Sequence, residues 1–336
     1  MAADRSAVPG RAAVAEFFTR RIVVITAVAL AGGLVAGGVA GATSDGGTHA
    51  HATVAAGRGT HARYRSAVAA RAGGQAVDPG LFSTGACMAF PATSGDRHET
   101  VFLDAGHGGV DPGAVGTTEG GATVEESTVN LAIELDTMTL LRAEGYRVVV
   151  SRTQNTSVTR LSPADTSDGV LSDQGAFADV TARDVCADLA RAAVLVGIYM
   201  DGGYQGDAGC LTGYDADRPF SAANLRLATL LQDDVLAAMN SRGYAIPDDG
   251  VLPDSGLGSA LTSAAVAYPH LLLLGPAKAG YFPTPSSMPG ALIEPLYVTD
   301  PMEASVAVSA AGQQAIAGGI AQAVGQYFTA ADQRRG

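Results

Sequence analysis

VFLDAGHGGVDPGAVG, residues 101–116, begins with a short apolar run of β-branched and aromatic side chains, which is typical of a buried strand. The apolar character ends at Asp104, and His107 follows among glycines. Because glycine lacks a Cβ atom, a ligand or ion can approach such a backbone closely. The turn alone fits two interpretations equally: a tight turn with a hydrogen-bonded histidine, or a strand end that presents a metal ligand or a base.

The residues after this turn predict a helix and then a second strand. Leu131, Leu135 and Met138 recur at helical spacing, and residues 147–151 have the apolar character of a strand. Glu126 stands in the first turn of the helix, where a carboxylate suits the helix dipole. We therefore predict an α/β fold: a single domain with a twisted mixed or mostly parallel sheet flanked by helices.

Within this unit, His107 and Glu126 are expected to meet at one end of the sheet. A histidine and a carboxylate brought together in this way are a start for a zinc site. Capping of the helix dipole alone is the simpler interpretation of Glu126 from its local sequence.

The composition bounds the class of protein. The chain has 336 residues, 47% of them hydrophobic, which is enough for one large domain with appendages. Its net charge of −12 argues against a nucleic-acid partner, because nucleic-acid binding requires a basic face.

The N-terminal part predicts export. Residues 22–42 carry no charge and are long enough to span a bilayer, either as a transmembrane anchor or as a cleaved signal peptide. Arg20 and Arg21 precede this run and place residues 1–21 in the cytoplasm by the positive-inside rule. Residues 43–98, rich in Gly, Ala, Ser, Thr and Arg, are interpreted as a flexible linker to an extracytoplasmic domain.

The three cysteines therefore lie in an oxidising compartment. Cys87, Cys186 and Cys210 can form at most one intramolecular disulfide, so that one thiol is left over. Their spacing does not match a cysteine zinc motif, and the sequence does not identify the pair.

Three segments together resemble a known family. Residues 101–116 are followed by EESTVNLAIELDTMTLLRAEGYRVVVSRTQN from Glu125, and later by MPGALIEPLYVTDPMEA from Met288. This series is similar to the zinc-dependent N-acetylmuramoyl-L-alanine amidases of the bacterial cell wall. The resemblance spans residues 99–328 and leaves 329–336 as a C-terminal tail. It implies that His107 and Glu126 are the first two zinc ligands and that Glu294 is the catalytic acid.

The chain departs from the family pattern at the third zinc ligand. When Arg183 is set on the arginine that leads the corresponding family helix, Tyr199 falls where the family has its histidine. A neutral phenol is a poor zinc ligand, although a bound zinc ion could lower its pKa. Asp201 would point the same way if the strand continues, and His270 is a further alternative.

The implied activity is hydrolysis of the amide bond between the lactyl group of N-acetylmuramic acid and L-alanine in peptidoglycan. Zinc would lower the pKa of a bound water and polarise the carbonyl, while Glu294 would take the water proton and return it to the leaving amine. Two alternatives stay open: a catalytically silent wall-binding or regulatory protein, and a mainly structural envelope protein.

Overall fold

The computed structural model describes residues 73–255, 257, 268–279 and 284–332. Their helices and strands follow in the order β1 (Gln75–Ala76), β2 (Ala86–Phe90), β3 (Thr100–Ala105), β4 (Val115–Thr117), β5 (Thr123–Glu125), α3 (Glu126–Ala143), β6 (Arg147–Arg152), η1 (Pro163–Asp165), β7 (Thr166–Ser167), β8 (Val170–Leu171), α4 (Asp173–Leu189), β9 (Val194–Ile198), β10 (Cys210–Tyr214), α5 (Ser221–Asn240), β11 (Asp248–Pro253), β12 (Gly290–Glu294), α6 (Pro301–Val308) and α7 (Ala310–Asp332).

The main sheet of the described residues has eight strands in the order β1-β2-β6-β3-β9-β12-β10-β11. The four central strands β6, β3, β9 and β12 run parallel to one another. β2 and β10 lie antiparallel to their inner neighbours β6 and β12, and β11 runs parallel to β10. The predicted mixed sheet flanked by helices is thus confirmed.

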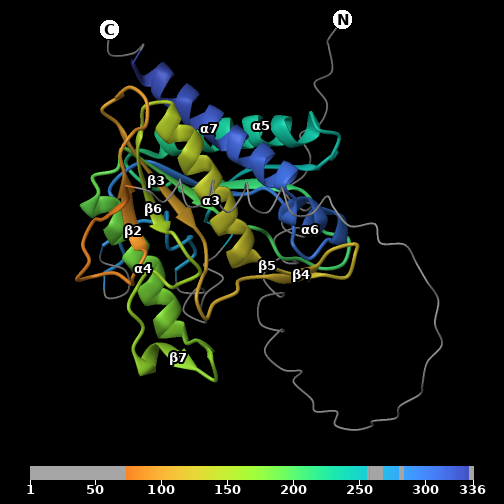
Figure 1. The fold of residues 1–336 in the computed structure, drawn as a ribbon, viewed down its shortest axis with the longest axis horizontal. Helices are drawn as coiled ribbons and strands as arrows, with labels where there is room; N and C mark the ends of the chain where they lie inside the picture. Colours follow the sequence, from red (N-terminus) through yellow and green to blue (C-terminus); the bar gives the residue numbers. More distant parts are fainter. Residues whose placement is uncertain (1–72, 256, 258–267, 280–283, 333–336) are drawn as a thin grey trace, which may run out of the picture.

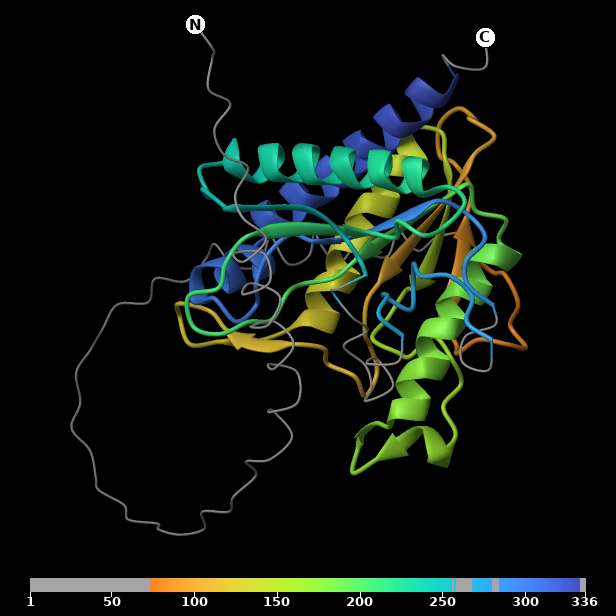
Figure 2. The same ribbon diagram turned by 180° about the vertical axis from the view of Figure 1, so that it is seen from behind.

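Alternate residues of the central strands face two separate apolar cores, as the two-residue period of a strand requires. Val101 and Leu103 of β3 face one core, whereas Phe102 faces the other. Helices α3, α5 and α7 pack together over the first core, and α4 covers the opposite face (Figures 1 and 2). Burial on both faces explains why the central strands read as nearly continuous apolar runs.

The ordered fold begins earlier than the expected boundary at residue 98. β1 and β2 belong to the main sheet, so the part of the predicted linker from Gln75 to Phe90 is an integral part of the domain. The expected tail from residue 329 also begins too early, because α7 continues to Asp332. The C-terminal segment forms two helices, α6 and α7, because Ser309 between them is extended, with ψ 143°.

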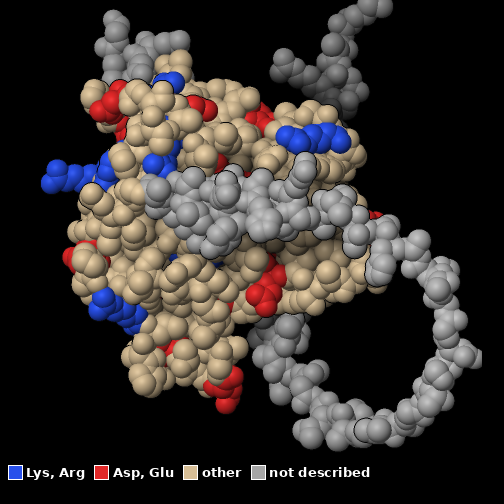
Figure 3. Space-filling model, viewed as in Figure 1, with Lys and Arg blue, Asp and Glu red and all other residues tan. Residues whose placement is uncertain are grey.

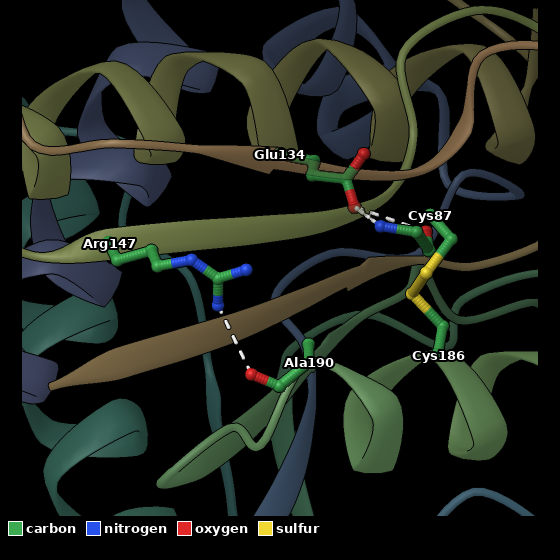
Figure 4. Close-up of a disulfide and its surroundings, with 6 residues drawn as sticks. Cys87, Glu134, Arg147, Cys186 and Ala190 are labelled. Atoms are coloured by element: carbon green, nitrogen blue, oxygen red, sulfur yellow. Dashed lines mark hydrogen bonds between the residues drawn. A yellow bond between two sulfur atoms is a disulfide. The ribbon is translucent and has the colours of Figure 1, made fainter. Parts of the chain in front are cut away.

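A disulfide joins β2 to the helix that packs over the second apolar core. Cys87 of β2 is bonded to Cys186 of α4 (Figure 4), and Cys210 is a free, buried thiol. The side chain of Arg147 on β6 donates to the carbonyl oxygen of Ala190, just after α4, at 3.1 Å and ties the same helix to the sheet. The expectation of one disulfide and one remaining thiol is confirmed.

The predicted membrane segment 22–42 and the first part of the predicted linker lie outside the described residues. Within the part of the chain that the structure describes, no helix has the length and apolar character needed to cross a membrane. On the face seen in Figure 3, the acidic and basic side chains of the described residues are scattered over a surface that is mostly uncharged.

Candidate active site

The candidate site lies where three parallel strands end. The register aligns Ala105 of β3 with Ile198 of β9, and Ile198 with Ile293 of β12. His107, Tyr199 and Glu294 therefore leave the sheet at the same edge, as expected for the carboxyl ends of parallel strands.

The turn after β3 brings His107 to the start of α3. His107 Nε2 lies 3.2 Å from Glu126 Oε2, and its Nδ1 lies 2.8 Å from Asp111 Oδ2. His107 has a positive φ of 62°, a backbone region that a non-glycine residue occupies at a cost of about 1–2 kcal/mol. Such strain persists when the surrounding structure fixes it, and it is frequent at functional sites.

The contact between the side chains of His107 and Glu126 depends on Gly113. A Cβ atom built at Gly113, where φ is 68°, would lie 2.5 Å from Glu126 Oε2 and 2.7 Å from His107 Cδ2. Glycine is therefore required here both for its backbone conformation and for the room that it leaves.

The charges around His107 and Glu126 favour the ionised forms of both side chains. Burial on its own lowers the pKa of His107, but the carboxylates of Glu126 and Asp111 outweigh it and raise that pKa to about 10. For Glu126, burial raises the pKa, whereas the charge and hydrogen bond of His107 lower it below the usual value. In the absence of another cation, His107 is held as an imidazolium between two carboxylates.

Glu126 is fixed by further hydrogen bonds. Its Oε2 accepts from the backbone N–H of Ala114 at 2.8 Å, and its Oε1 accepts from the N–H of Met200 at 3.0 Å and from Asn130 Nδ2 at 3.1 Å. The carboxylate is thereby attached to the β3–α3 connection, to α3 itself and to the end of β9. Its orientation is set before any ligand binds.

Tyr199 belongs to a buried polar network behind His107. Its ring lies 5.5 Å from the His107 ring, centroid to centroid, and its hydroxyl donates to Asp104 Oδ2 at 3.0 Å. Burial, and next the negative charge of Asp104, raise the pKa of Tyr199 well above its usual value. The hydroxyl is therefore neutral and engaged.

Arg183 of α4 completes this network. Its guanidinium donates to Asp104 Oδ1 at 2.7 Å and to Asp179 Oδ2 at 2.8 Å. It also donates to the carbonyl oxygens of Ala105 at 2.7 Å and His107 at 2.8 Å. Arg183 thus holds the backbone of the turn that carries His107, a role visible in the sequence only through its family alignment.

Two further buried side chains support the same turn and were not identified from the sequence. Arg152, at the end of β6, donates to the carbonyl oxygens of Ala105 and Gly106. Glu134 of α3 accepts from the N–H of Ala105 at 3.0 Å, and burial raises its pKa to about 8. A buried charge is costly unless it is paired, so such residues are recognisable only once the contacts are known.

Asp201 and Glu294 lie near the same edge. Asp201 forms a parallel bridge with Tyr297, and its Oδ1 accepts from the N–H of Gly202 at 2.8 Å. Glu294 is the last residue of β12, is partly exposed and stands opposite Leu211 of β10.

A different group of side chains meets the geometric requirement for a metal site. Among the described residues, Asp215, Asp254 and His270 place three ligand atoms within 4.8 Å of one another. Asp215 follows β10, which runs antiparallel to β12, so this group lies at the opposite edge of the sheet from His107. His270 therefore lies at the opposite edge of the sheet from His107, and the alternative that it is the third ligand of that site is wrong.

Solved structures of several amidases are similar to this chain. The amidase CwlD of Clostridioides difficile, solved in complex with the lipoprotein GerS, is similar over 69% of this chain and 99% of its own, with a TM-score of 0.52 and 20% identity. AmiC2 of Nostoc punctiforme is similar over 70% of this chain and 99% of its own, with a TM-score of 0.47 and 21% identity. Ami1 of Mycobacterium smegmatis covers 70% of this chain and 100% of its own, with a TM-score of 0.48 and 18% identity.

No curated protein matches the sequence. The family model of the N-acetylmuramoyl-L-alanine amidases matches residues 101–326, which is more than half of the chain. This range runs from β3, which carries the candidate site, into α7. The chain is a peptidoglycan amidase, and it belongs to the N-acetylmuramoyl-L-alanine amidase family.

Proposed function

We propose that this chain hydrolyses the bond between N-acetylmuramic acid and L-alanine at the sheet edge that carries His107, Glu126 and Glu294, with zinc as its cofactor. The observation that carries the proposal is the contact between His107 Nε2 and Glu126 Oε2, with His107 Nδ1 held by Asp111.

The donor set fits two of the zinc ligands. Ligand atoms at about 2.0–2.1 Å from a tetrahedral zinc ion lie about 3.3 Å apart, and the Nε2–Oε2 distance is 3.2 Å. Asp111 accepts the Nδ1 proton, which leaves Nε2 free as a ligand, in the usual carboxylate–histidine–zinc arrangement. Because His107 must lose its Nε2 proton to bind a metal, a bound zinc ion would take the place of that proton and of its positive charge.

The third ligand would come from Asp201 or Tyr199. The ligand atoms of Asp201, His107 and Glu126 do not all lie within 4.8 Å of one another in this structure, so Asp201 would have to move to bind the metal. The Tyr199 hydroxyl is the less favourable of the two, since it would have to leave Asp104 and ionise although burial raises its pKa. Asp201 is a carboxylate, an ordinary zinc ligand. A site with this third ligand holds zinc less firmly than a site with two histidines.

Glu294 acts as the acid–base residue. Zinc, when bound, would lower the pKa of a water molecule and polarise the scissile carbonyl. Glu294 would take a proton from the attacking water as the new carbon–oxygen bond forms, and it would deliver this proton to the leaving nitrogen as the carbon–nitrogen bond breaks. The products are a free lactyl carboxyl group and the free amine of L-alanine.

The setting of this reaction is the cell envelope. The Cys87–Cys186 disulfide is typical of proteins outside the cytoplasm, and peptidoglycan is the partner that the reaction requires. The predicted membrane segment 22–42 would keep the domain near the membrane, as an anchor, or would release it, as a signal peptide.

Glu294→Gln tests this assignment. The amide keeps the shape of the side chain but cannot accept the proton, so release of muropeptides with a free L-alanine amine should fall by about 10²–10⁴. Glu125→Gln is the matched control, since Glu125 is an exposed carboxylate beside Glu126. If wild type and Glu294→Gln release the same near-background amount, the catalytic assignment fails.

The alternative function, silent wall binding, is favoured by one specific observation. The residue at the family's histidine position, Tyr199, is engaged by Asp104 within a network that Arg183 completes. Under this alternative, peptidoglycan would still bind, and the Glu294→Gln change would alter neither binding nor release.

A further inference from the structure

A second cluster of ionisable side chains is buried at the sheet edge opposite the candidate active site. Asp215 follows β10 and Asp254 follows β11, and these two strands run parallel. Because β10 is antiparallel to β12, with Leu211 opposite Glu294 and Gly213 opposite Leu292, the strand end at Asp215 points away from Glu294. The cluster is therefore separate from the His107 site.

The two carboxylates converge on one nitrogen atom. His270 Nδ1 lies 3.1 Å from Asp215 Oδ2 and 3.1 Å from Asp254 Oδ1. Both aspartates are fully buried and His270 is 9% exposed. Water therefore does not solvate these charges freely, and the cluster must balance them internally.

The hydrogen bonds of the cluster leave one buried carboxylate oxygen without a donor. His270 Nδ1 carries at most one proton, and its hydrogen bond goes to Asp254. Asp215 Oδ2 is buried, faces Nδ1 and accepts no hydrogen bond. Throughout the described residues, neither aspartate forms an ion pair with an arginine or lysine. A buried carboxylate oxygen that accepts no hydrogen bond needs either a proton, since burial raises the pKa of the neighbouring Asp254 to about 7, or an additional cation.

The outer oxygens of the carboxylates are already fixed by backbone groups. Asp215 Oδ1 accepts from the N–H of Asp217 at 2.7 Å and of Arg218 at 2.8 Å. Asp254 Oδ2 accepts from the N–H of Leu271 at 3.1 Å. These bonds aim the remaining oxygens at His270, as the supporting hydrogen bonds of metal ligands do.

We propose that Asp215, Asp254 and His270 form a second metal site, which binds a divalent first-row transition metal such as zinc. The two distances of 3.1 Å are close to the separation of about 3.3 Å between ligand atoms around tetrahedral zinc. The imidazole nitrogen favours zinc over calcium or magnesium, which prefer oxygen ligands. With the metal on Nδ1, the Nε2 proton faces Asp217 Oδ2, 3.7 Å away.

The site has a structural role. It joins the carboxyl ends of β10 and β11 to the segment that begins at His270, three chain segments that no disulfide connects. Metal binding to ligands that converge only in the folded state stabilises the folded chain.

Zinc content of the full chain in a His107→Ala background tests the proposal independently of the candidate active site. After dialysis, this variant should retain about one zinc ion per chain. Adding Asp215→Asn or Asp254→Asn should weaken zinc binding by more than about 100-fold, beyond the usual effect of supporting residues. Adding Asp233→Asn, which alters an exposed carboxylate on α5, should leave the zinc content unchanged.

A second measurement requires no change in the cluster. Zinc added to the His107→Ala chain should slow hydrogen exchange of the N–H groups of Arg218 and Leu271, and cobalt should give the absorption of a tetrahedral ion. A chain without bound zinc, in which the cluster is only a hydrogen-bonded ion triad, overturns the proposal. So does zinc binding that Asp215→Asn and Asp254→Asn leave unchanged. Loss of zinc from the active site alone bears on the proposed function and leaves this inference standing.

Discussion

At the scale of single residues, Tyr199 decides how well the active site holds a metal. Tyr199→His should raise zinc affinity and amidase activity together, because a neutral nitrogen ligand replaces a phenol that is bound to Asp104. Tyr199→Phe is the control: it removes the same hydroxyl, adds no ligand and should not raise zinc binding. Zinc titration of chains with the Asp254→Asn change isolates this site. A decrease with histidine would mean that the site depends on Tyr199 itself.

His107 gives the metal-free domain a defined pH dependence. Its pKa in the folded state is raised from the usual 6.5 to about 10, so its stabilising contribution is complete below pH about 6.5. That contribution declines as the pH rises toward 10. With a chelator present, the difference in unfolding free energy between wild type and His107→Ala should therefore shrink from pH 6.5 to 10. Urea unfolding across this range measures it. A constant difference would contradict the raised pKa.

At the scale of elements, the chain from β3 through α3 to β6 could be predicted because its local patterns agree with the final fold. The apolar run of β3 is buried on both faces, and α3 begins at Glu126, in the expected first turn. The role of residues 75–90 could not be predicted from local pattern. β2 has only five residues, and its place beside β6 depends on distant contacts, including the Cys87–Cys186 disulfide.

The candidate site, too, could be predicted from local sequence only in part. The sequence identified His107 and Glu126 because a turn and a helix start place them close together along the chain. It did not identify the contact of Tyr199 with Asp104, which lies 95 residues away. It also did not identify the grouping of Asp215 and Asp254 with His270. The two aspartates follow strands with no distinctive pattern, and they lie close together only because β10 and β11 are neighbours in the sheet.

The connection between β3 and α3 is testable as an element. Gly113→Ala should displace the His107–Glu126 pair and reduce zinc binding and activity, because the new Cβ atom would lie 2.5 Å from Glu126 Oε2. Gly121→Ala is a matched control in the same connection: its φ is +80° and its Cβ atom would meet nothing within 4 Å. Both changes should cost about 1–2 kcal/mol of stability through backbone strain. Only Gly113→Ala should affect the site, and equal losses of activity would indicate strain alone.

At the scale of the whole molecule, one mixed sheet separates two chemical tasks. The carboxyl ends of β3, β9 and β12 carry the candidate active site, and the reversed direction of β10 and β11 places the second cluster at the far edge. Helices cover both faces of the sheet, so polar side chains gather where the strands end (Figures 1 and 2). Changes in one cluster should therefore affect the other little, since distant sites add independently.

The oxidation state of Cys87 and Cys186 indicates the cellular compartment in which the domain lies. If residues 22–42 direct export, Cys87 and Cys186 should be oxidised in the full chain expressed in bacteria, since disulfides form outside the cytoplasm. Alkylation after rapid denaturation should then label one thiol per chain, that of Cys210. A chain without residues 22–42 stays in the reducing cytoplasm and should show all three thiols, and Cys210→Ala should lower each count by one. Three labelled thiols in the full chain would place the domain in the cytoplasm, where peptidoglycan is out of reach.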